Sequence, residues 1–450
     1  MDSAQPALMT EGDLRRRIIT FAVPIFIGSL FQQLYNTADS LIVGNLVGSA
    51  ALAAVSSTGS IVYLAVGFFM GFSMGAGIVI ARHIGAGNHE LTQRSVHTAV
   101  AAGLALSVIM TLASVLAADP ILRATGTPDS VFRDASVYLH IYFLGISALV
   151  MYNTFVGILQ AAGDSRHPLC YLIISSCVNI VLDLLMVGTL RMGVAGAAIA
   201  TVISELLSAF LSLRRLMKIQ GDIHVDLHQI RFDAEELRQI VRYGLPTAMQ
   251  SCVIDLSNVL IQSYINSFGQ AAMAGIGAYT KVEGFAFLPV TAFSMSMSTF
   301  VSQNRGAGRI PRMKEGIRFG LRSAVISIEI IGAVFFLFAP QLIRAFSSDP
   351  EVIAYGVGRA RVVSLFFCLL GFSHVTSAVM RGVGKPVVPM AVMLTCWCAV
   401  RVAVLMTIGR MMHVIALTYW IYPFTWSLSS LVYLVYLRKI MRRETFDQNS

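Results

Sequence analysis

Long apolar runs separated by short polar connections dominate this chain. Twelve of these runs reach the roughly 20 residues that a helix needs to cross the hydrocarbon core of a bilayer. They cover approximately residues 16–43, 52–80, 95–117, 135–160, 167–188, 194–217, 240–266, 274–302, 316–339, 353–380, 387–408 and 413–437. The pattern predicts an all-α membrane protein with twelve transmembrane helices.

One connection is longer and more polar than the others. Residues 218–239 hold eight charged side chains between the sixth and seventh apolar runs. This segment is the natural boundary between two halves. We therefore expect an N-terminal six-helix lobe at 1–217, a cytoplasmic linker at 218–239 and a C-terminal six-helix lobe with a basic tail at 240–450.

Composition supports a membrane location. The 450 residues are 56% hydrophobic and 13% charged, whereas soluble domains carry about 25% charged residues. All six cysteines fall inside apolar runs, which favours small core residues over disulfides or metal ligands. The first apolar run is too long for the core of a signal peptide, so we expect no cleavable signal.

The net charge of +9 reflects topology. If both termini are cytoplasmic, the inside segments hold 24 of the 33 Lys and Arg residues, as the positive-inside rule requires. We therefore expect a multi-pass protein of the cell inner or plasma membrane with both termini inside, and no nucleic-acid partner.

An internal repeat links the two halves. Several landmarks recur 221 positions later, and one proline recurs 222 positions later. The pairs are Phe72-Ser73-Met74 with Phe293-Ser294-Met295, Gly85-Ala86-Gly87 with Gly306-Ala307-Gly308, Pro168 with Pro389, and Pro24 with Pro246. Two six-span copies insert the same way up, so a pseudo-two-fold axis along the membrane normal is expected, with a substrate site near the midplane. This arrangement favours a two-lobe transporter, and a duplicated channel or receptor is the alternative.

The first span carries a polar face. Gln32, Tyr35, Asn36 and Asp39 stand at i, i+3, i+4 and i+7, so they share one side of a helix. A carboxylate at that depth costs about 2.5–3.5 kcal/mol on insertion scales and usually serves ion or proton handling. A polar contact between helices is the alternative.

Spans five and six add to this chemistry. Asn179 with Asp183, and Thr201 with Glu205, are spaced i, i+4 and so project from one face of each helix. Two nearby carboxylates at low dielectric tend to hold one proton between them. Neutral oxygens from the amide and the hydroxyl would also suit Na⁺, so the coupling ion is H⁺ or Na⁺.

The repeat provides a comparison for these residues. An offset of 221 places Leu260 opposite Asp39, and it places Val400 and Val404 opposite Asn179 and Asp183. The paired acid chemistry is therefore expected in the first half alone.

The second half has its own intramembrane charges, namely Asp255, Lys281, Glu283 and Arg401. Such charges usually pair. Arg401 paired with Asp255 or Glu283 would be structural, whereas an unpaired Asp255 would attract a cationic substrate. Both interpretations remain open at this point.

Methionines recur near the cores of two spans. Met70 and Met74 on span two, with Met295 and Met297 on span eight, suit a cleft that repacks around varied ligands. Ordinary core or lipid-facing packing is the alternative.

A serine motif suggests a different class of protein. Gly71-Phe-Ser73-Met-Gly75 matches the GxSxG nucleophile elbow, but that elbow belongs to a strand-to-helix turn. The second copy, at 292–296, lacks both glycines. An intramembrane serine hydrolase is thus a minor alternative. The two Gly-Ala-Gly turns are expected to be helix C-caps with left-handed glycine.

These features together resemble the multidrug and toxic compound extrusion (MATE) family. The resemblance rests on two six-span halves, the Gly-Ala-Gly turns, Pro24 and Asp39 in the first helix, and Asn179-x3-Asp183 followed by Thr201. It covers about residues 14–440 and is closer to the DNA-damage-inducible branch. Another branch carries a glutamate on span seven and an aspartate on span ten, where this chain shows Asp255 and His374.

The resemblance implies a secondary transporter that exports amphipathic, cationic compounds by alternating access, in antiport with H⁺ or Na⁺. It implies ion coupling at Asp39, Asn179, Asp183 and Thr201, which would also hold Na⁺, and a hinge at Pro24 that bends when Asp39 is protonated. The expected substrate-binding residues are Gln32, Tyr35, Asn36, Met70, Met74, Asp255 and Met295.

We expect no enzymatic activity, no cofactor, no resident metal ion and a monomer that contacts membrane lipid. A flippase for lipids or lipid-linked oligosaccharides is the alternative function. Such relatives typically have fourteen spans, whereas this chain has twelve.

Overall fold

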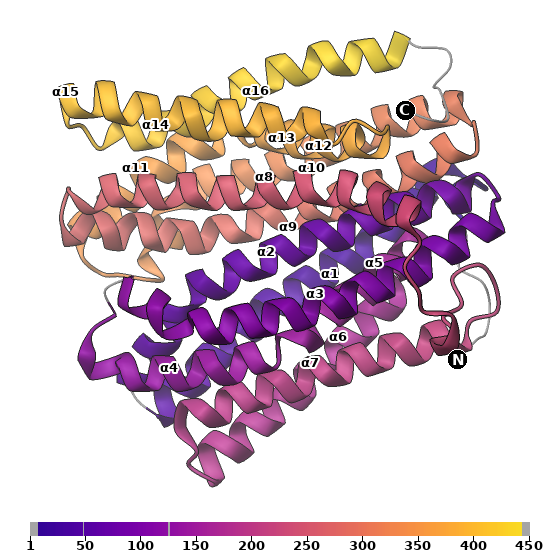
Figure 1. Cartoon of the computed structure of the whole chain (residues 1–450). Coiled ribbons are helices and arrows are strands. Elements are labelled where there is room, and N and C mark those ends of the chain that lie inside the picture. The colour runs from indigo at the N-terminus through magenta and orange to yellow at the C-terminus, as the bar shows by residue number, and fades with distance from the viewer. Residues whose placement is uncertain (1–7, 48, 125–126, 443–450) are drawn as a thin grey trace. The chain divides into compact units, whose positions relative to one another are not determined.

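The computed structural model describes residues 8–47, 49–124 and 127–442 (Figure 1). Every regular element in these ranges is helical. The first half contains α1 (Leu14–Leu46), α2 (Ser49–Gly85), α3 (His89–Ala124), α4 (Asp129–Leu144), α5 (Ile146–Ala161), α6 (Arg166–Asp183), the π-helix η1 (Leu184–Thr189) and α7 (Gly193–Lys218).

The second half has more interruptions. After the short 3₁₀ turn η2 (Leu227–Gln229) come α8 (Ala234–Asn266), α9 (Gln270–Gly306), α10 (Ile310–Arg344), α11 (Pro350–Ser364), α12 (Phe367–Gly382), α13 (Val387–Met393), the π-helix η3 (Leu394–Ala399), α14 (Val400–Val404), the π-helix η4 (Leu405–Gly409), α15 (Arg410–Met412) and α16 (Ala416–Arg442).

Many of these helices have the length and composition of membrane spans. Among the described residues, seven pass by length and hydropathy, and nine pass if each of two bent helix pairs is counted as one span. When continuous and bent segments are grouped, the described helices fall into twelve stretches that match the twelve apolar runs. The all-α, twelve-span prediction is therefore confirmed.

Two of the predicted spans are broken, which the hydrophobic pattern did not indicate. The run at 135–160 is α4 and α5 bent by 45°, and the run at 353–380 is α11 and α12 bent by 58°. The first bend lies at Gly145, where an added β-carbon would collide with the Val202 side chain. Glycine thus permits α7 to approach the bend closely.

The chain forms two compact units, each of which joins separate stretches of sequence. The first unit comprises Ile27–Ala248, and the second joins Met9–Phe26 to the chain from Met249 onward. The polar segment 218–239 therefore lies within the first unit. Both changes of unit occur inside a continuous helix, two residues after Pro24 in α1 and two residues after Pro246 in α8.

Small residues let α2 and α8 cross closely in the first unit. β-Carbons added at Gly71 and Gly75 would overlap the backbone at Ala248 and Gly244, respectively. Spacing of small residues by four positions is the usual way for membrane helices to bring their backbones together. Ser73, between the two glycines, donates its hydroxyl hydrogen to the Asn153 carbonyl. The GxSxG sequence is thus a packing element within a helix and not a nucleophile elbow.

The polar segment is fixed to the α2–α3 hairpin by specific hydrogen bonds. Glu236 is 2% exposed and accepts a hydrogen bond from Ser95, while His83 Nε2 lies 3.1 Å from its carboxylate. Further along, the Asp233 amide donates to the Thr98 hydroxyl at 3.0 Å. These contacts account for the inclusion of the segment in the first unit.

The two Gly-Ala-Gly turns end α2 and α9 as predicted. Gly87 and Gly308 have φ angles of +66° and +65°. The Asn88 amide bonds to the His83 carbonyl at 3.1 Å, and the Arg309 amide bonds to the Asn304 carbonyl at 2.9 Å. These are Schellman-type C-caps, in which a left-handed glycine lets the chain fold back over the last carbonyls.

Candidate functional site

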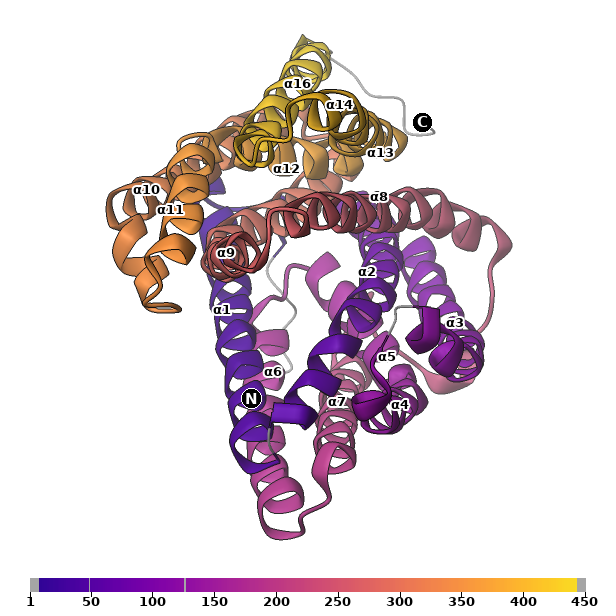
Figure 2. The same ribbon diagram turned by 90° about the vertical axis from the view of Figure 1, so that its left-hand side faces the viewer.

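Three helices of the first unit bring the predicted ion-coupling residues together. Asp39 lies on α1, Asn179 and Asp183 lie on α6, and Thr201 lies on α7. Helices α6 and α7 pack side by side along their length (Figure 2). The carboxyl groups of Asp39 and Asp183 are close enough to interact directly. The structure thus brings these four predicted residues into one region.

Most of the polar side-chain atoms at this site lack hydrogen-bond partners among the described residues. Asn179 and Asp183 are both 0% exposed, and their side-chain oxygens, together with the Asn179 amide nitrogen, have no hydrogen-bond partner among the described residues. Thr201 donates its hydroxyl to the Ala197 carbonyl at 3.0 Å, which leaves its oxygen lone pairs available. Because buried polar groups are normally satisfied, this concentration of free acceptors indicates a ligand site.

A backbone irregularity follows the site. The α-helix α6 ends at Asp183, and the π-helix η1 begins with the next residue, Leu184. A π-helical segment inserts an extra residue into a helix and is frequent at functional sites. The insertion therefore sets the direction of the side chains that follow Asp183, which sequence periodicity alone did not predict.

Tyrosines surround the two carboxyl groups. Tyr35 lies within electrostatic range of Asp39 and Asp183 and is in side-chain contact with Thr201. Tyr138 of α4, which is 9% exposed, lies near the same two acids. Sequence reasoning identified Tyr35 by its helix face but missed Tyr138, since α4 showed no polar stripe.

Glu205 is not part of this cluster of acceptors. It is half-buried on α7, one turn beyond Thr201, and its carboxyl group contacts the Tyr142 hydroxyl. It also lies near Tyr138.

The expected substrate-binding residues differ in their surroundings. Gln32, Asn36 and Met70 are exposed in the structure, whereas Met74 and Met295 are partly buried. The side chain of Asp255 lies outside the described part of the structure. Met297 is 0% exposed and packs into the core against Gly320, so it does not line a cleft.

The intramembrane charges of the second half form a different pairing from the one expected. Glu283 lies 4.0 Å from Arg359 of α11. Arg401 instead donates from Nε to the Thr425 hydroxyl at 3.1 Å. Lys281 is exposed. The proposed pair of Arg401 with Glu283 is therefore replaced by Arg359 with Glu283.

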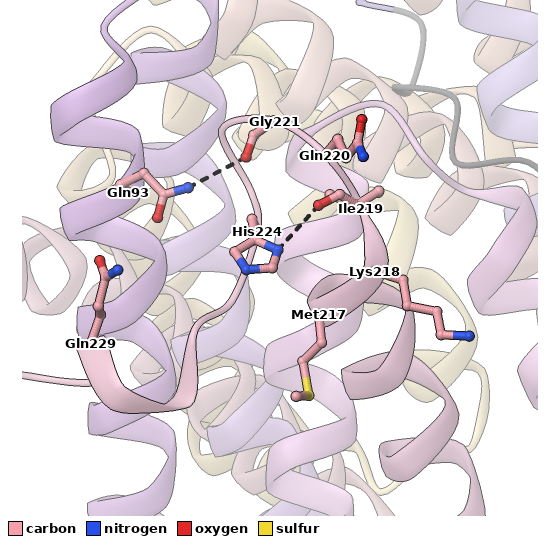
Figure 3. Close-up of a pocket in the computed structure, with 8 residues that line it drawn as sticks. All are labelled: Gln93, Met217, Lys218, Ile219, Gln220, Gly221, His224 and Gln229. Carbon is pink, nitrogen blue, oxygen red and sulfur yellow. Dashed lines mark hydrogen bonds between the residues drawn. The ribbon is translucent and has the colours of Figure 1, made fainter.

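A surface pocket of about 610 Å³ lies elsewhere, at the end of α7 (Figure 3). Gln93 donates to the Gly221 carbonyl at 3.4 Å, and the His224 ring lies 3.1 Å from the Ile219 carbonyl. None of the predicted site residues lines this pocket. It is formed by the polar segment 218–239 and is separate from the acceptor cluster.

Comparison with known proteins is consistent with this arrangement. The MatE family model matches the chain twice, at residues 24–185 and 246–407. The two matches confirm the internal duplication, with one copy in each half.

Individual relatives align over most of their length. A probable multidrug resistance protein of Bacillus subtilis, YoeA, is 26% identical over 457 residues, covering 99% of this chain and 98% of its own. An FAD transporter of Shewanella oneidensis is 25% identical over 355 residues, covering 77% of each chain. The outward-facing structure of a multidrug resistance MATE transporter superimposes with a TM-score of 0.89 at 23% identity, covering 96% of this chain and 97% of that one.

The two family matches together span more than half of the chain, and the likeness in fold extends over nearly all of it. The protein therefore belongs to the multidrug and toxic compound extrusion (MATE) family of multi-pass membrane transporters.

Proposed function

We propose that this protein is a secondary active transporter that exports amphipathic organic compounds against an inward flow of H⁺ or Na⁺. The observation that carries the proposal is the cluster of unpartnered acceptors at Asn179 and Asp183 beside Asp39. These three residues, with Thr201, are the proposed coupling site.

The physical basis is the energetics of two carboxyl groups at low dielectric. Two negative charges this close repel each other, so the pair favours a state that holds one cation between them, either H⁺ or Na⁺. If one conformation of the transporter binds the cation more tightly than the other, cation binding shifts the equilibrium towards that conformation. A substrate that also prefers one of the two conformations is then coupled to the cation, because each ligand changes the affinity for the other by the same factor.

The residues present fit Na⁺ as well as a proton. Carboxylate, amide and hydroxyl oxygens are the ligands that hard cations prefer, and Asp39, Asn179, Asp183 and Thr201 provide all three types. No group of three or more His, Cys, Asp or Glu side chains that could hold a metal ion occurs among the described residues. We propose no cofactor beyond the coupling ion.

We place both termini in the cytoplasm of a cell whose inner or plasma membrane holds the protein. The support is the excess of Lys and Arg on the segments that this orientation assigns to the inside. The same orientation makes the segment 218–239 cytoplasmic.

The substrate class is proposed from the relatives and from chemistry. The Bacillus relative is named for multidrug resistance, and the Shewanella relative for FAD. The acidic first half favours amphipathic cations, while the exposed Met70, Gln32 and Asn36 offer adaptable contacts. We propose that these residues, with Tyr35, Met74 and Met295, contact the exported compound.

The test is transport in proteoliposomes containing the purified protein. A fluorescent cationic dye is loaded, and proton and sodium gradients are imposed separately. We expect one gradient to accelerate dye movement and Asp183→Asn to abolish the acceleration. Asp134→Asn, an exposed acid on α4, serves as the matched control and should behave as wild type. Dye movement that is independent of both gradients would overturn the proposal. Gradient-independent flipping of a labelled lipid would favour the flippase alternative.

A further inference from the structure

The buried positions of the two halves follow the same register, which identifies the counterpart of each site residue. Every buried residue of α4 has a buried counterpart 221 positions later in α11. The pairs are Val131 and Val352, Ala135 and Gly356, Tyr138 and Arg359, Leu139 and Ala360, Tyr142 and Val363, and Phe143 and Ser364. Arg359 therefore occupies the place in the second half that Tyr138 occupies beside the acids of the first.

The same register holds between α7 and α16. The buried Ser204, Ser208 and Ser212 correspond to the buried Thr425, Ser429 and Tyr433, again 221 positions later. At this offset Tyr422 takes the place of Thr201.

A π-helical insertion shifts the register in the helix that corresponds to α6. Before the insertion the offset is 221, as shown by Pro168 and Pro389. After η3 the buried residues match at 222, so that Asn179, Asp183 and Val187 correspond to Arg401, Leu405 and Gly409. An extra residue in a π-helix has this effect. The counterparts assigned from sequence, Val400 and Val404, were therefore wrong by one position.

The counterpart site has the opposite polarity. Where the first half places acids and neutral oxygens, the second half places two guanidinium groups among aromatic rings. The guanidinium carbon of Arg401 lies 4.4 Å from the Tyr422 ring centroid and 5.1 Å from the Trp397 ring centroid. The guanidinium carbon of Arg359 lies 4.6 Å from the same Tyr422 centroid. Both arginines are almost fully buried, at 1% and 3% exposed.

Among the side chains that the structure describes, one acid lies near these two cations. Glu283 lies 4.0 Å from Arg359 and accepts a hydrogen bond from the Tyr279 hydroxyl at 3.2 Å. Arg401 reaches no acid at ion-pair distance among the described residues; its Nε donates to the Thr425 hydroxyl. The described cluster thus carries an excess of positive charge in the interior of a membrane protein, where an uncompensated charge is costly.

Hydrogen-bond donors in the cluster are also left over. Arg401 Nη2, Arg359 Nε and Trp426 Nε1 have no partner among the described residues. The Trp426 ring centroid lies 5.8 Å from that of Tyr422 and 6.3 Å from that of Trp397, so Trp426 belongs to the same cluster of side chains. In the first half the unpartnered atoms of the equivalent site are mainly acceptors, on Asn179 and Asp183.

We propose that this Arg359–Arg401 cluster binds a small monovalent anionic group, either a free halide ion or the carboxylate of an exported compound. An anion supplies the missing charge and accepts from the unpartnered donors, and guanidinium groups are well suited to both tasks. Binding is an equilibrium property of the second unit, so it does not depend on the proposed coupling mechanism of the first. Only the carboxylate source rests on the proposed function.

The site contains its own reporter. The chain has three tryptophans, of which Trp397 and Trp426 lie in the cluster and Trp420 is 54% exposed. In a Trp420→Phe background, the purified full-length protein is titrated with sodium bromide at constant ionic strength, with divalent sulfate as the replacement anion. We expect bromide to quench tryptophan fluorescence saturably and chloride to compete. Quenching that is linear in bromide and insensitive to chloride would overturn the proposal, without requiring any variant of the cluster to fold.

Variants then locate the site. Arg401→Gln and Arg359→Gln should each weaken saturable quenching about tenfold or more, because each removes charge-assisted hydrogen bonds to the ion. Arg361→Gln is the matched control, since Arg361 lies on the same helix two residues from Arg359 but is exposed. Equal bromide affinity in all three variants would place the ion elsewhere and contradict the assignment.

The source of the anion is distinguished by competition with benzoate and with benzamide, its uncharged isostere. Competition by benzoate but not by benzamide would show that the cluster accepts a carboxylate. Competition by chloride alone would identify a free halide as the occupant. Loss of gradient-driven transport in Asp183→Asn, with bromide binding unchanged, would separate this site from the coupling site.

Discussion

Gly75 of α2 lies directly against Gly244 of α8, leaving no space for a β-carbon at the first of these positions. One turn earlier, Gly71 meets Ala248 in the same way. The two helices therefore cross at backbone contact, and their packing depends on small residues spaced four apart on both partners.

Substitution of Gly75 by valine should destabilise the first unit. The side chain would overlap the Gly244 backbone, and overpacking of this kind costs about 1–3 kcal/mol or more. Thermal unfolding in detergent would measure the change. Gly277→Ala is the control, because that helical glycine has open space around its added β-carbon and alanine favours the helix by about 0.5–1 kcal/mol. Equal unfolding temperatures for the Gly75 variant and wild type would contradict the close crossing.

Glu236 fixes the polar segment to the α2–α3 hairpin, so its removal should also destabilise the protein. Glu236→Ala leaves the buried His83 and Ser95 without their shared partner, at a cost of about 1–3 kcal/mol. The neighbouring Glu235 is exposed, and Glu235→Ala should change stability by less than about 0.5 kcal/mol. Limited proteolysis between residues 218 and 239 gives a second readout, and we expect faster cleavage only in the Glu236 variant.

Asp164 gives a prediction about pH. Burial tends to raise the pKa of this carboxyl group, but hydrogen bonds from His167, at 2.6 Å and 3.1 Å, and the attraction of His167 and Arg215 outweigh it and hold the pKa below its ordinary value. The charged form therefore stabilises the folded state. This contribution is fully present above the unfolded-state pKa of about 3.9 and is lost as pH falls through the folded-state pKa.

A comparison of wild type with Asp164→Asn tests whether folding lowers the pKa of Asp164. At pH 7 the variant should unfold at a lower temperature, with a loss of about 1–2 kcal/mol. The difference should shrink as pH is lowered through 4 towards 3. A difference that grew on acidification would show that the folded state raises the pKa instead.

Sequence reasoning predicted which first-half side chains lie together because that information is local. The i, i+4 spacing of Asn179 and Asp183 fixes a shared helix face, and the cost of burying a carboxyl group drew attention to Asp39. Sequence reasoning failed where an irregular backbone decides which residues of the two halves correspond. The π-helix at Leu394–Ala399 moves Arg401 into the place of Asn179, and no hydrophobic period records a one-residue insertion.

Sequence reasoning also did not predict which residues of different helices contact each other. Arg359 is buried beside Glu283 of another helix, whereas the sequence had suggested Arg401 as the partner of Glu283. Its partner depends on how α9 and α11 pack, which side-chain spacing within one helix does not specify. The bend at Gly145 was missed for a similar reason, since it depends on the approach of Val202.

Pro24 should act as a hinge in α1. It lies two residues before the point at which α1 passes from the second unit to the first, and proline removes one helix hydrogen bond. Pro24→Ala should therefore slow gradient-driven dye efflux several-fold while leaving dye binding intact. Pro120→Ala is the control, because Pro120 lies inside α3, within one unit. Undiminished efflux by the Pro24 variant would exclude the hinge.

Asp39 and Asp183 should contribute jointly to coupling. If the two acids share one cation, losing either removes the site, so Asp39→Asn, Asp183→Asn and the double variant should have nearly equal effects on coupled efflux. Asn179→Ala and Thr201→Ala should weaken coupling less, because each removes one neutral oxygen. Dye binding should partly survive in all of them, since the substrate contacts lie on other residues.

The measurement is a double-mutant cycle in proteoliposomes, with dye efflux and ion flux recorded on the same preparations. Strongly non-additive losses, with the double variant no worse than either single one, would support a shared cation. Additive partial losses would mean that the two carboxyl groups act separately, and wild-type coupled efflux in either single variant would exclude that residue from the coupling site. Because the buried amide and carboxyl oxygens of α6 have no hydrogen-bond partner in the part of the chain that the structure describes, Asn179→Ala and Asp183→Asn should not unfold more readily than wild type. Removing an unpaired buried charge relieves a cost, and a retained or raised unfolding temperature would separate a coupling defect from misfolding.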